Sequence, residues 1–472
     1  MHIHLIGVCG TGMGALAGLL RASGHRVSGS DTAFYPPMGD ALLRWGVETR
    51  EGFDAAHLSP RPDLVIVGNV CRPNNVEARA AIDAGMPYRS LPGALRELYL
   101  SRARSFVVTG THGKTTTSAL LSYLLDRCGL QPGFLIGGLP VDFDHSFQAP
   151  GSDAQDAPFV VEGDEYDSAF FEKYAKFLQY EPQVATINAI EHDHIDIYPD
   201  MESYLDAFRR FVALLPDDGL LMFNAADTHA AQLARTAGCR ALGFALSADG
   251  GNHVAADVIA TPRGYDDGMQ RFDLDFAGQH LDGLSLPLSG AHNLRNALAA
   301  LGMAHAGAGV PLPQLADALA DFGGVRRRQE LRGTPAGVRV YDDFAHHPTA
   351  VAETLDGLRA RHPDGKLIAI FEPRSATASR NLHQDIYPAA FDSADVVLLS
   401  PVGRPEIADD ERLDVAAIAE RIAERGPRAE AQPSVDAIVD RIQTLAGPGD
   451  TVVAMSNGAF GGIYDKLLGA LA

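Results

Sequence analysis

The chain has few cysteines, and they are far apart. Its four cysteines are at positions 9, 71, 128 and 239, and no two of them form a C-x-x-C pair. The spacing predicts neither a zinc knuckle nor a disulfide framework, and a reducing compartment fits it best. The sequence also lacks an apolar run of membrane-spanning length, and its start lacks the basic segment and cleavage site of a signal peptide. We therefore expect a cytoplasmic protein without a membrane partner.

An excess of basic residues is absent as well. The chain carries 39 Lys and Arg against 60 Asp and Glu, and its basic residues are scattered. The formal net charge of -21 opposes contact with a polyanionic backbone, so a nucleic-acid partner is not expected. The hydrophobic content of 46% is typical of a soluble globular protein, and 472 residues exceed a single hydrophobic core. Two to four domains are expected.

The first hundred residues alternate between strand and helix patterns. A strand at 2–6 precedes a glycine-rich turn and an apolar helix that ends near residue 24, and further strands follow at 26–29 and 64–68. This alternation predicts a doubly wound parallel sheet, in which ligands bind at the carboxyl ends of the strands. The candidate substrate-binding residues there are Gly10, Gly12, Asp31 and Asn69.

The segment 107–117, Val-Val-Thr-Gly-Thr-His-Gly-Lys-Thr-Thr-Thr, reads as a strand, a glycine turn and the start of a helix. Glycines let backbone N–H groups approach a phosphate, Lys114 adds a positive charge, and Thr115 offers a hydroxyl to Mg2+. The standard phosphate-loop pattern would have a glycine where Val108 stands. A chance Gly-Lys-Thr is the alternative. We predict ATP binding through Gly110, Thr111, His112, Gly113, Lys114, Thr115 and Thr116.

Two later segments carry candidate metal ligands. Glu162 ends an apolar strand at 159–161, and Mg2+ prefers such oxygen ligands, although an acidic solvated loop is the alternative. The strand 184–188 leads into the cluster Glu-His-Asp-His-Ile-Asp, which contains His194. This cluster resembles a metal site, but a histidine beside an aspartate is also common at a helix cap.

Candidate nucleotide contacts follow in the second half of the chain. Asn293 and Asn296 lie one turn apart at the start of a predicted helix, where they could read an adenine edge or cap the helix. Three arginines at 326–328 follow a Gly-Gly pair. They could clamp phosphates at a hinge between domains, or form a solvated basic run.

The last 150 residues alternate between strands and helices again, with one helix expected at 382–391. Three predicted strands end in polar loops, at 342–348, 372–375 and 456–462. Because the carboxyl ends of parallel strands share one edge of a sheet, a substrate pocket is expected there. Domain boundaries are predicted near residues 103 and 325.

In their order along the chain, these motifs resemble the Mur ligase family. They are Gly-Thr-His-Gly-Lys-Thr-Thr, then Glu162, Asp-His-x-Asp, His-Asn-x-x-Asn and Asp-x-Ala-His, and the match covers essentially the whole chain. The resemblance implies an α/β enzyme that uses ATP to join an amino acid or peptide to a UDP-N-acetylmuramoyl carrier. It implies three domains: a Rossmann-like UDP-sugar domain (1–102), a P-loop ATPase-like domain (103–324) and a Rossmann-like peptide-binding domain (325–472).

The resemblance also implies roles for single residues. Lys114 would contact the ATP phosphates, and Thr115, Glu162 and His194 would bind Mg2+, with Lys114, Glu162 and His194 as the catalytic set. Asn293 and Asn296 would read the adenine. Arg328 would be the hinge arginine, and Asp343 and His346 would contact the nucleotide. Several family members have a modified lysine where this chain has Arg209-Arg210, so a carbamylated lysine is not assumed.

Within the family, the loop Phe-Glu-Pro-Arg-Ser at 371–375 resembles members that attach L-alanyl-γ-D-glutamyl-meso-diaminopimelate to UDP-N-acetylmuramate in peptidoglycan recycling. Members that add free L-alanine, which are the alternative, normally have Phe-Gln-Pro-His-Arg there. Candidates for binding the peptide carboxylates are Arg374, Ser456 and Asn457. A nicotinamide-dependent dehydrogenase and a nucleotide-gated UDP-sugar-binding protein are weaker alternatives. We expect a monomer or a weak homo-oligomer.

Overall fold

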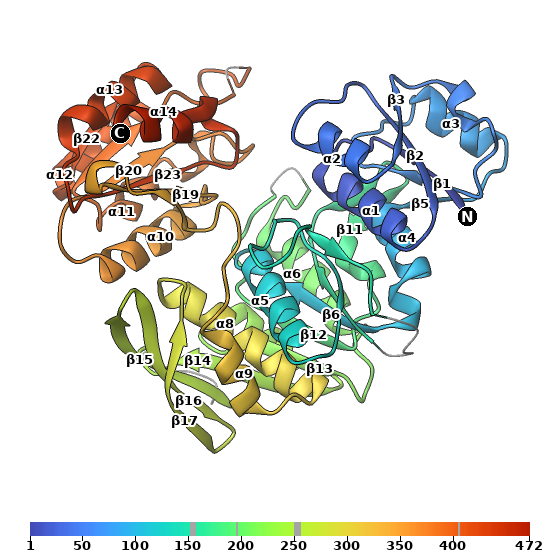
Figure 1. Cartoon of the computed structure of the whole chain (residues 1–472), viewed down its shortest axis with the longest axis horizontal. Helices are drawn as coiled ribbons and strands as arrows, with labels where there is room; N and C mark the ends of the chain where they lie inside the picture. Colours follow the sequence, from blue (N-terminus) through green and yellow to red (C-terminus); the bar gives the residue numbers. More distant parts are fainter. Residues whose placement is uncertain (152–156, 195–196, 250–255, 405) are drawn as a thin grey trace. The chain divides into compact units, whose positions relative to one another are not determined.

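The computed structural model describes residues 1–472 except 152–156, 195–196, 250–255 and 405 (Figure 1). The chain is a mixed α/β protein that divides into two compact units. The first unit comprises Met1–Ile259, Asp275–Gln279 and Arg295–Phe322. The second comprises Ala260–Leu274, His280–Leu294 and Gly323–Ala472.

The first unit begins with the predicted parallel sheet. Its strands are β1 (His2–Ile6), β2 (Arg26–Asp31), β3 (Glu48–Glu51), β4 (Leu64–Val67) and β5 (Tyr88–Ser90). The strand order is β3-β2-β1-β4-β5, with every pair parallel, so the order reverses between β1 and β4. The helices are α1 (Thr11–Ala22), α2 (Met38–Arg44), α3 (Val76–Asp83) and α4 (Leu91–Leu98). The doubly wound sheet is confirmed, and a ligand crevice is expected where the order reverses.

Seven strands that belong entirely to the first unit form a second sheet region. They are β6 (Arg104–Thr109), β7 (Gly133–Leu135), β8 (Phe147–Gln148), β9 (Pro158–Glu162), β12 (Val184–Ile187), β13 (Leu220–Asn224) and β14 (Arg240–Leu246). Their order is β14-β13-β12-β6-β9-β7-β8, and β6 is parallel to both β9 and β12. The loops after β6, β9 and β12 therefore leave the same edge of the sheet.

In the part of the chain that the structure describes, the middle segment contains five α-helices and five further strands. The helices are α5 (Lys114–Arg127), α6 (Met201–Val212), α7 (Thr228–Ala234), α8 (Ala291–Gly302) and α9 (Leu312–Leu319). The further strands are β10 (Asp167–Ala169), β11 (Glu172–Ala175), β15 (Val258–Asp266), β16 (Met269–Phe276) and β17 (Gln279–Leu286). Strands β15, β16 and β17 continue the central sheet beyond β14, and β10 and β11 pair with each other. The boundary between the two units passes through β15, β16, β17 and α8.

The amino-terminal sheet and the central sheet of the first unit share one hydrophobic core. Leu16 of α1, Phe147 of β8 and Phe159 of β9 belong to the same buried cluster. Trp45 meets Phe147 edge to face, with ring centroids 4.9 Å apart. A Cβ atom at Gly18 would lie 2.2 Å from the Phe147 ring, so α1 accepts this ring only because residue 18 is glycine. Packing of this kind holds the two sheets together.

The second unit contains a six-stranded sheet in the order β18-β19-β23-β20-β21-β22. Its strands are β18 (Glu330–Gly333), β19 (Arg339–Asp343), β20 (Leu367–Phe371), β21 (Val396–Leu399), β22 (Arg428–Ala431) and β23 (Thr451–Met455). Strand β18 is antiparallel to β19 and the other pairs are parallel. The helices are α10 (Pro348–Arg361), α11 (Tyr387–Ala390), α12 (Val415–Arg425), α13 (Val435–Leu445) and α14 (Ile463–Ala470).

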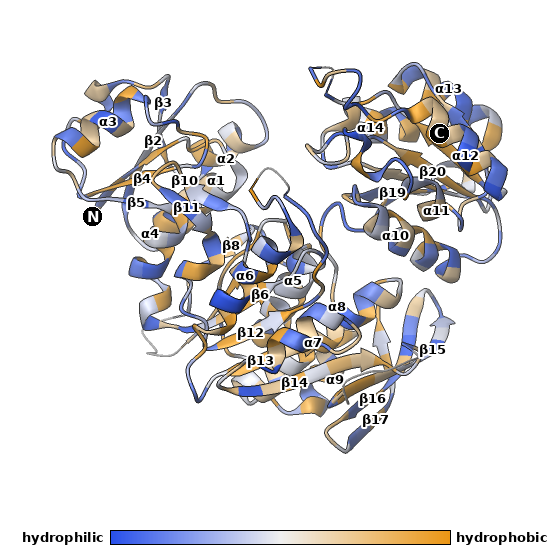
Figure 2. Cartoon of the chain, turned by 180° about the vertical axis from the view of Figure 1, so that it is seen from behind, coloured by the Kyte–Doolittle hydropathy of each residue, from blue (hydrophilic) through white to orange (hydrophobic). Residues whose placement is uncertain are grey.

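Both faces of this sheet are buried. Along β20, Ala369 and Phe371 belong to one core cluster, while Ile368 and Ile370 belong to another. Figure 2 shows the hydrophobic colour concentrated on the strands, as expected for parallel sheets covered on both sides. Among the residues that the structure describes, no helix combines the length and apolarity needed to cross a membrane.

One predicted helix of the second unit is wrong. The sequence favoured a helix over 382–391, but only α11 (Tyr387–Ala390) is α-helical, preceded by a short 3-10 turn, Asn381–His383. Pro388 has no N–H group and would clash with the preceding turn of a longer helix, so it stands at the beginning of α11 instead.

Candidate functional site

The turn between β6 and α5 is the tightest part of the candidate site. It contains Gly110 at φ 120° and Gly113 at φ 79°, conformations that residues with a side chain rarely adopt. A Cβ atom at Gly110 would lie 2.9 Å from the backbone nitrogen of Ala189. At Gly113 it would lie 2.2 Å from Oδ1 of Asn296. Both glycines are therefore required, and the amino end of α5 follows directly, as in sites that bind phosphate.

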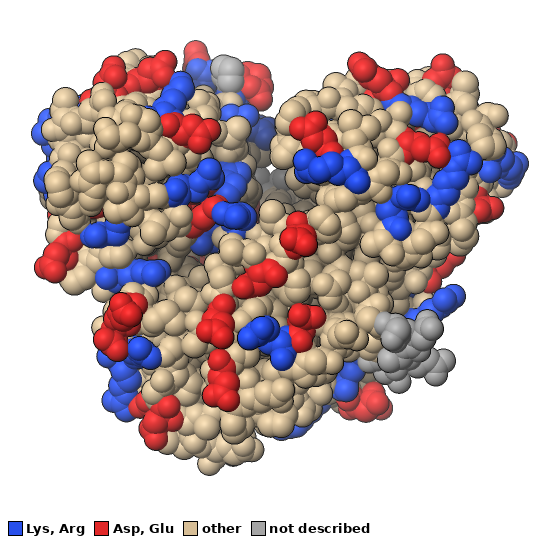
Figure 3. Space-filling model, viewed as in Figure 1, with Lys and Arg blue, Asp and Glu red and all other residues tan. Residues whose placement is uncertain are grey.

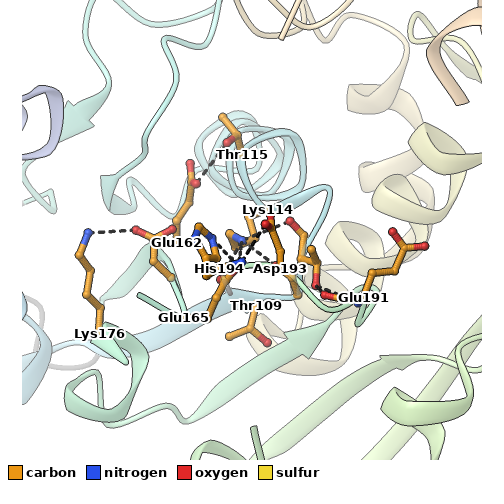
Figure 4. A network of polar contacts seen from close by, with 12 residues as sticks. Thr109, Lys114, Thr115, Glu162, Glu165, Lys176, Glu191, Asp193 and His194 are labelled. Carbon is orange, nitrogen blue, oxygen red and sulfur yellow. Dashed lines mark hydrogen bonds and ion pairs between the residues drawn. The ribbon is translucent and has the colours of Figure 1, made fainter. Parts of the chain in front are cut away.

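Lys114, the first residue of α5, makes a buried ion pair that the sequence analysis missed (Figure 4). Its Nζ donates to both carboxylate oxygens of Glu165, at 2.9 and 3.2 Å, and to the Gly110 carbonyl at 2.7 Å. The side chains of Lys114 and Glu165 are only 13% and 1% exposed. Burial by itself would lower the pKa of Lys114, but the Glu165 carboxylate raises it above its usual value. The ammonium therefore stays charged.

Glu165 keeps its charge as well. Burial by itself would raise the pKa of this carboxyl, but Lys114 and His194 lower it to about 2. The position of Glu165 in the sequence indicates that it lies near the phosphate turn, because it follows Glu162 by three residues in the loop after a strand that is parallel to β6. The sequence pattern does not show that Glu165 pairs with Lys114.

Thr115 and Glu162 meet beside this ion pair. Thr115 Oγ1 donates to Glu162 Oε2 at 3.1 Å (Figure 4). The Gly137 backbone nitrogen donates to Glu162 Oε1 at 2.7 Å. Glu162 is the last residue of β9, as predicted. A hydroxyl and a carboxylate at the edge of a phosphate turn are the oxygen ligands that Mg2+ prefers. The residues present thus fit this ion.

His194 follows β12 in the same region. Its backbone is left-handed, at φ 52°, and its Nε2 lies 3.4 Å from Glu165 Oε1. Burial lowers the pKa of this imidazole, but the neighbouring Glu165 carboxylate raises it more, so the net shift is upward. Ile195 and Asp196, the end of the Asp-His-x-Asp motif, lie outside the described residues.

Two further side chains tie the phosphate turn to its surroundings. The buried Tyr204 of α6 donates to Glu165 Oε1 at 3.2 Å and lies 3.0 Å from Thr111 Oγ1. The Thr111 hydroxyl accepts from the Glu191 backbone nitrogen at 3.0 Å. His112 Nε2 lies 2.8 Å from Glu191 Oε2. Sequence reasoning did not identify Tyr204, because nothing in the α6 pattern distinguishes it from a core residue.

The two candidate adenine-reading residues both lie in α8 but in different units. In the first unit, Asn188 Nδ2 donates to Asn296 Oδ1 at 3.4 Å and to Thr117 Oγ1 at 2.9 Å, which places Asn296 beside the phosphate turn. In the second unit, Asn293 Nδ2 donates to the Ser289 carbonyl at 2.8 Å.

The amino-terminal candidates lie at the carboxyl ends of β1, β2 and β4. Asp31 Oδ2 accepts from the Cys9 backbone nitrogen at 2.7 Å, which fixes the glycine turn after β1. Gly10 precedes α1, and Gly12 lies in its first turn. Asn69 Nδ2 donates to Asp167 Oδ1 at 3.1 Å. These residues surround the point at which the strand order reverses.

In the second unit, Asp343 organises the loop after β19. Its Oδ2 accepts from the Gln329 backbone nitrogen at 2.7 Å and its Oδ1 from the Ala345 nitrogen at 2.8 Å. The Arg328 guanidinium carbon lies 4.9 Å from the centre of the Phe344 ring. His346 Nδ1 lies 3.0 Å from the Phe344 carbonyl oxygen. The Asp343 carboxylate thus links the backbone at Gln329 to the backbone at Ala345.

The loops after β20 and β23 meet at a buried carboxylate. Glu372 accepts from the Ser456 hydroxyl and lies 3.5 Å from Arg374 Nη1. Arg374 packs against Gly458, where a Cβ atom would lie 2.3 Å from its Nε. Asn457 Oδ1 is buried and has no hydrogen-bond partner among the described residues. The three predicted peptide contacts Arg374, Ser456 and Asn457 are therefore neighbours, with one acceptor unsatisfied.

Acidic and basic side chains are mixed on the face of the protein that Figure 3 shows. On the face in Figure 3, Lys and Arg lie among Asp and Glu and form no continuous basic stripe. This distribution agrees with the scattered basic residues of the sequence.

Models of three protein families match successive parts of the chain. The family described as Mur ligase family, catalytic domain, matches residues 2–102, and the Mur ligase middle domain matches residues 108–304. The family described as Mur ligase, glutamate ligase domain, matches residues 327–458. The matches cover most of the chain and both of its units.

Whole-length relatives and solved structures agree with this match. UDP-N-acetylmuramate--L-alanyl-gamma-D-glutamyl-meso-2,6-diaminoheptandioate ligase of Escherichia coli (strain K12) is 38% identical over 100% of this chain and 98% of its own. UDP-N-acetylmuramate--L-alanine ligase of Roseiflexus sp. (strain RS-1) is 35% identical over 97% of this chain and 96% of its own. The crystal structure of a murein peptide ligase from Psychrobacter arcticus 273-4 matches with a TM-score of 0.70. The two sequences are 36% identical, and the match covers 100% of this chain and 98% of that one.

A more distant solved structure supports the fold alone. UDP-N-acetylmuramate-alanine ligase MurC from Thermotoga maritima is 22% identical, with a TM-score of 0.78 over 99% of this chain and 98% of that one. Together with the phosphate turn between β6 and α5, these matches show that the chain belongs to the Mur ligase family of ATP-dependent ligases.

Proposed function

We propose that this enzyme joins the tripeptide L-alanyl-γ-D-glutamyl-meso-diaminopimelate to UDP-N-acetylmuramate, with cleavage of ATP to ADP and phosphate, in peptidoglycan recycling. The observation that carries the proposal is the likeness, over the whole chain, to relatives named for this reaction, at 38% and 36% identity. The glutamate in the loop Phe371-Glu372-Pro373-Arg374-Ser375 supports the same choice over the L-alanine-adding members.

The reaction needs an activated carboxyl group. The lactyl carboxylate of muramate is a poor electrophile, so one of its oxygens attacks the γ-phosphorus of ATP, and ADP leaves. The resulting acyl phosphate reacts with the neutral α-amine of the peptide. The amine loses a proton, inorganic phosphate departs and an amide remains. The Lys114 ammonium would stabilise the charge on the γ-phosphoryl oxygens during the first step.

Mg2+ is the proposed metal, and Thr115, Glu162 and His194 are its proposed ligands. When bound, the ion would neutralise part of the charge on the phosphate oxygens. The contact between Thr115 and Glu162 at 3.1 Å supports this assignment. Glu162 would also orient the Thr115 hydroxyl, which donates to it.

The remaining assignments concern the nucleotide and the carrier. Asn293 and Asn296 would read the adenine, Arg328 would act at the hinge, and Asp343 and His346 would contact the nucleotide. Gly10, Gly12, Asp31 and Asn69 would bind the UDP sugar. Their position where the strand order reverses supports this role, because that is where open α/β sheets bind ligands.

Three domains, 1–102, 103–324 and 325–472, remain part of the proposal. The family matches at 2–102, 108–304 and 327–458 support these boundaries. The peptide-binding role of the last domain rests on Arg374, Ser456 and Asn457. A bidentate guanidinium and the donors of this loop suit a peptide that carries several carboxylates. We further propose a cytoplasmic monomer or weak homo-oligomer.

A single substrate comparison tests the function. The enzyme is given ATP, Mg2+ and UDP-N-acetylmuramate with L-alanine, the tripeptide or the corresponding tetrapeptide, and phosphate release and the mass of the UDP-linked product are measured. The tripeptide should give the highest kcat/KM. A preference for L-alanine would establish the alternative ligase instead, and phosphate release that needs neither carrier nor amine would exclude ligation.

A variant at Arg374 separates the peptide site from the ATP site. Arg374→Ala should raise the KM for the tripeptide at least about tenfold, which corresponds to about 1.4 kcal/mol, while the KM for ATP stays near the wild-type value. Arg380→Ala, at a nearby arginine paired with Glu411, is the matched control. Equal effects on the two KM values would contradict the role of Arg374 in peptide binding.

A further inference from the structure

Glu165 is the most enclosed charged group near the phosphate turn, and the reaction scheme gives it no role. Its carboxylate, 1% exposed, receives contacts from three separate elements. They are the Lys114 ammonium of α5, the Tyr204 hydroxyl of α6 and, at 3.4 Å, His194 Nε2 in the loop after β12. The carboxylate is thus a common anchor for two side chains that the proposed reaction needs.

The contacts restrict Lys114 strongly. A lysine ammonium stands on a flexible stem, and ordering it costs about 1.5 to 2 kcal/mol of side-chain entropy. Here Nζ is directed at both Glu165 oxygens and at the Gly110 carbonyl, so the charge is already held against the turn. Its ordering is completed before a phosphate enters.

Glu165 is itself fixed from behind. The buried Tyr204 hydroxyl bridges its Oε1 and the Thr111 hydroxyl, and Tyr198 donates to its backbone carbonyl. A carboxylate fastened to the core at these points cannot follow Lys114 if the lysine moves. The geometry of the pair is therefore set by the fold rather than by the two side chains alone.

We propose that Glu165 is a positioning residue for phosphoryl transfer, which holds Lys114 and His194 at fixed places beside the turn between β6 and α5. The inference rests on the proposed function, in which Lys114 meets the γ-phosphate. Glu165 touches neither substrate nor metal in this role. It acts through Lys114 and His194. Because Lys114 would contact the phosphates both when ATP binds and when the phosphoryl group is transferred, the effect is on the affinity for ATP and on the rate of the phosphoryl step, where misplacing a reacting group by about 1 Å can cost about 100-fold.

The test compares three variants with the wild-type enzyme. Glu165→Gln keeps the shape and removes the charge, and Glu165→Asp keeps the charge on a shorter side chain. Asp164→Asn is the matched control. The Asp164 carboxylate pairs with Lys176 at 3.2 Å and acts on Lys114 only through its nearby charge, so this variant removes a charge without removing a direct contact to Lys114. For each, kcat and the three KM values are measured with the tripeptide, together with the unfolding midpoint and the Kd of ATP in the absence of carrier and peptide.

The expected result is a loss in kcat of about 10- to 100-fold for Glu165→Gln, with the KM values for carrier and peptide within about threefold. Glu165→Asp should recover part of the rate, and Asp164→Asn should stay near wild type. A Glu165→Gln enzyme with wild-type kcat overturns the proposal. So does a loss that only follows the folded fraction, or one that Asp164→Asn reproduces.

Failure of the proposed function gives a different outcome. If the wild-type enzyme makes no UDP-linked tripeptide, the reaction assignment fails, but the ATP affinity of the wild type and of Glu165→Gln can still be compared. An affinity for ATP that is the same within about twofold, beside a wild-type unfolding midpoint, would then show that Glu165 does not position Lys114.

Discussion

Gly113 carries two separate constraints, a left-handed backbone and a close approach to Asn296. Gly113→Ala should therefore weaken ATP binding at least about tenfold, since the added methyl group forces apart the turn and the Asn296 carboxamide. Equilibrium binding of ATP measures this effect. Gly129→Ala is the control, because Gly129 has φ 84° but open space around its Cβ position. If both variants bind ATP equally weakly, backbone strain alone is responsible.

The protonation of His362 links the stability of the second unit to pH. Burial, with the nearby Arg339 and Arg361, lowers the pKa of this imidazole to about 4, from about 6.5 in an unfolded chain. Between these values the unfolded chain takes up a proton that the folded chain does not. The contribution of the neutral His362 to the free energy of unfolding is therefore complete above about pH 6.5, and it is lost as the pH falls from about 6.5 towards 4.

His362→Phe should flatten this part of the pH dependence, measured as the free energy of unfolding between pH 7 and 4.5. His280→Gln serves as the comparison, because His280 is an exposed histidine in the same unit. An unchanged slope in His362→Phe would mean that other groups cause the acid sensitivity. Tyr341, whose hydroxyl lies 2.9 Å from His362 Nε2, is left in place in both variants.

At the scale of single elements, β8 matters more than its two residues suggest. Phe147 inserts its ring between Trp45 and Gly18 of the amino-terminal segment. Phe147→Ala should lower the free energy of unfolding by about 3 to 5 kcal/mol, as for other large core residues. Urea unfolding followed by circular dichroism measures this. Leu139→Ala, at a side chain 40% exposed in the preceding loop, should change it by less than about 0.5 kcal/mol.

Among the strands, sequence patterns predicted the buried parallel ones correctly. Residues such as Ile368 and Ile370 alternate with Ala369 and Phe371 between two cores, and this gives an uninterrupted apolar run that is easy to recognise. The edge strands β18 and β22 were missed because they are short and polar, Glu-Leu-Arg-Gly and Arg-Ala-Glu-Ala. Helix α13 was missed together with β22, since the two form one connection along the chain.

The candidate site could be predicted only in part, for a related reason. The turn with Lys114 and Thr115 is contiguous in the sequence, so its chemistry is visible there. Glu165 and Tyr204 come from separate elements, and only the parallel pairing of β6 with β9 and the packing of α6 bring them to Lys114. Their roles depend on distance, which no local pattern records.

For the molecule as a whole, the shared core of the first unit predicts that its two sheets do not fold independently. A chain of residues 103–472 would expose the apolar surface around Phe147 and Phe159 that α1 and its neighbours cover. It should bind a hydrophobic dye strongly and elute as aggregates in size-exclusion chromatography. A soluble monomer with a wild-type unfolding midpoint would contradict this expectation.

The single tryptophan of the chain lies at this same junction. Trp45 meets His145 and Phe147 edge to face, so its indole fluorescence depends on whether the amino-terminal sheet remains in contact with β8. Every other aromatic residue of the chain is a phenylalanine or tyrosine, which emits at shorter wavelength. The enzyme therefore carries its own optical probe, and stopped-flow mixing with each substrate in turn can test, without any label, whether the amino-terminal sheet shifts against β8.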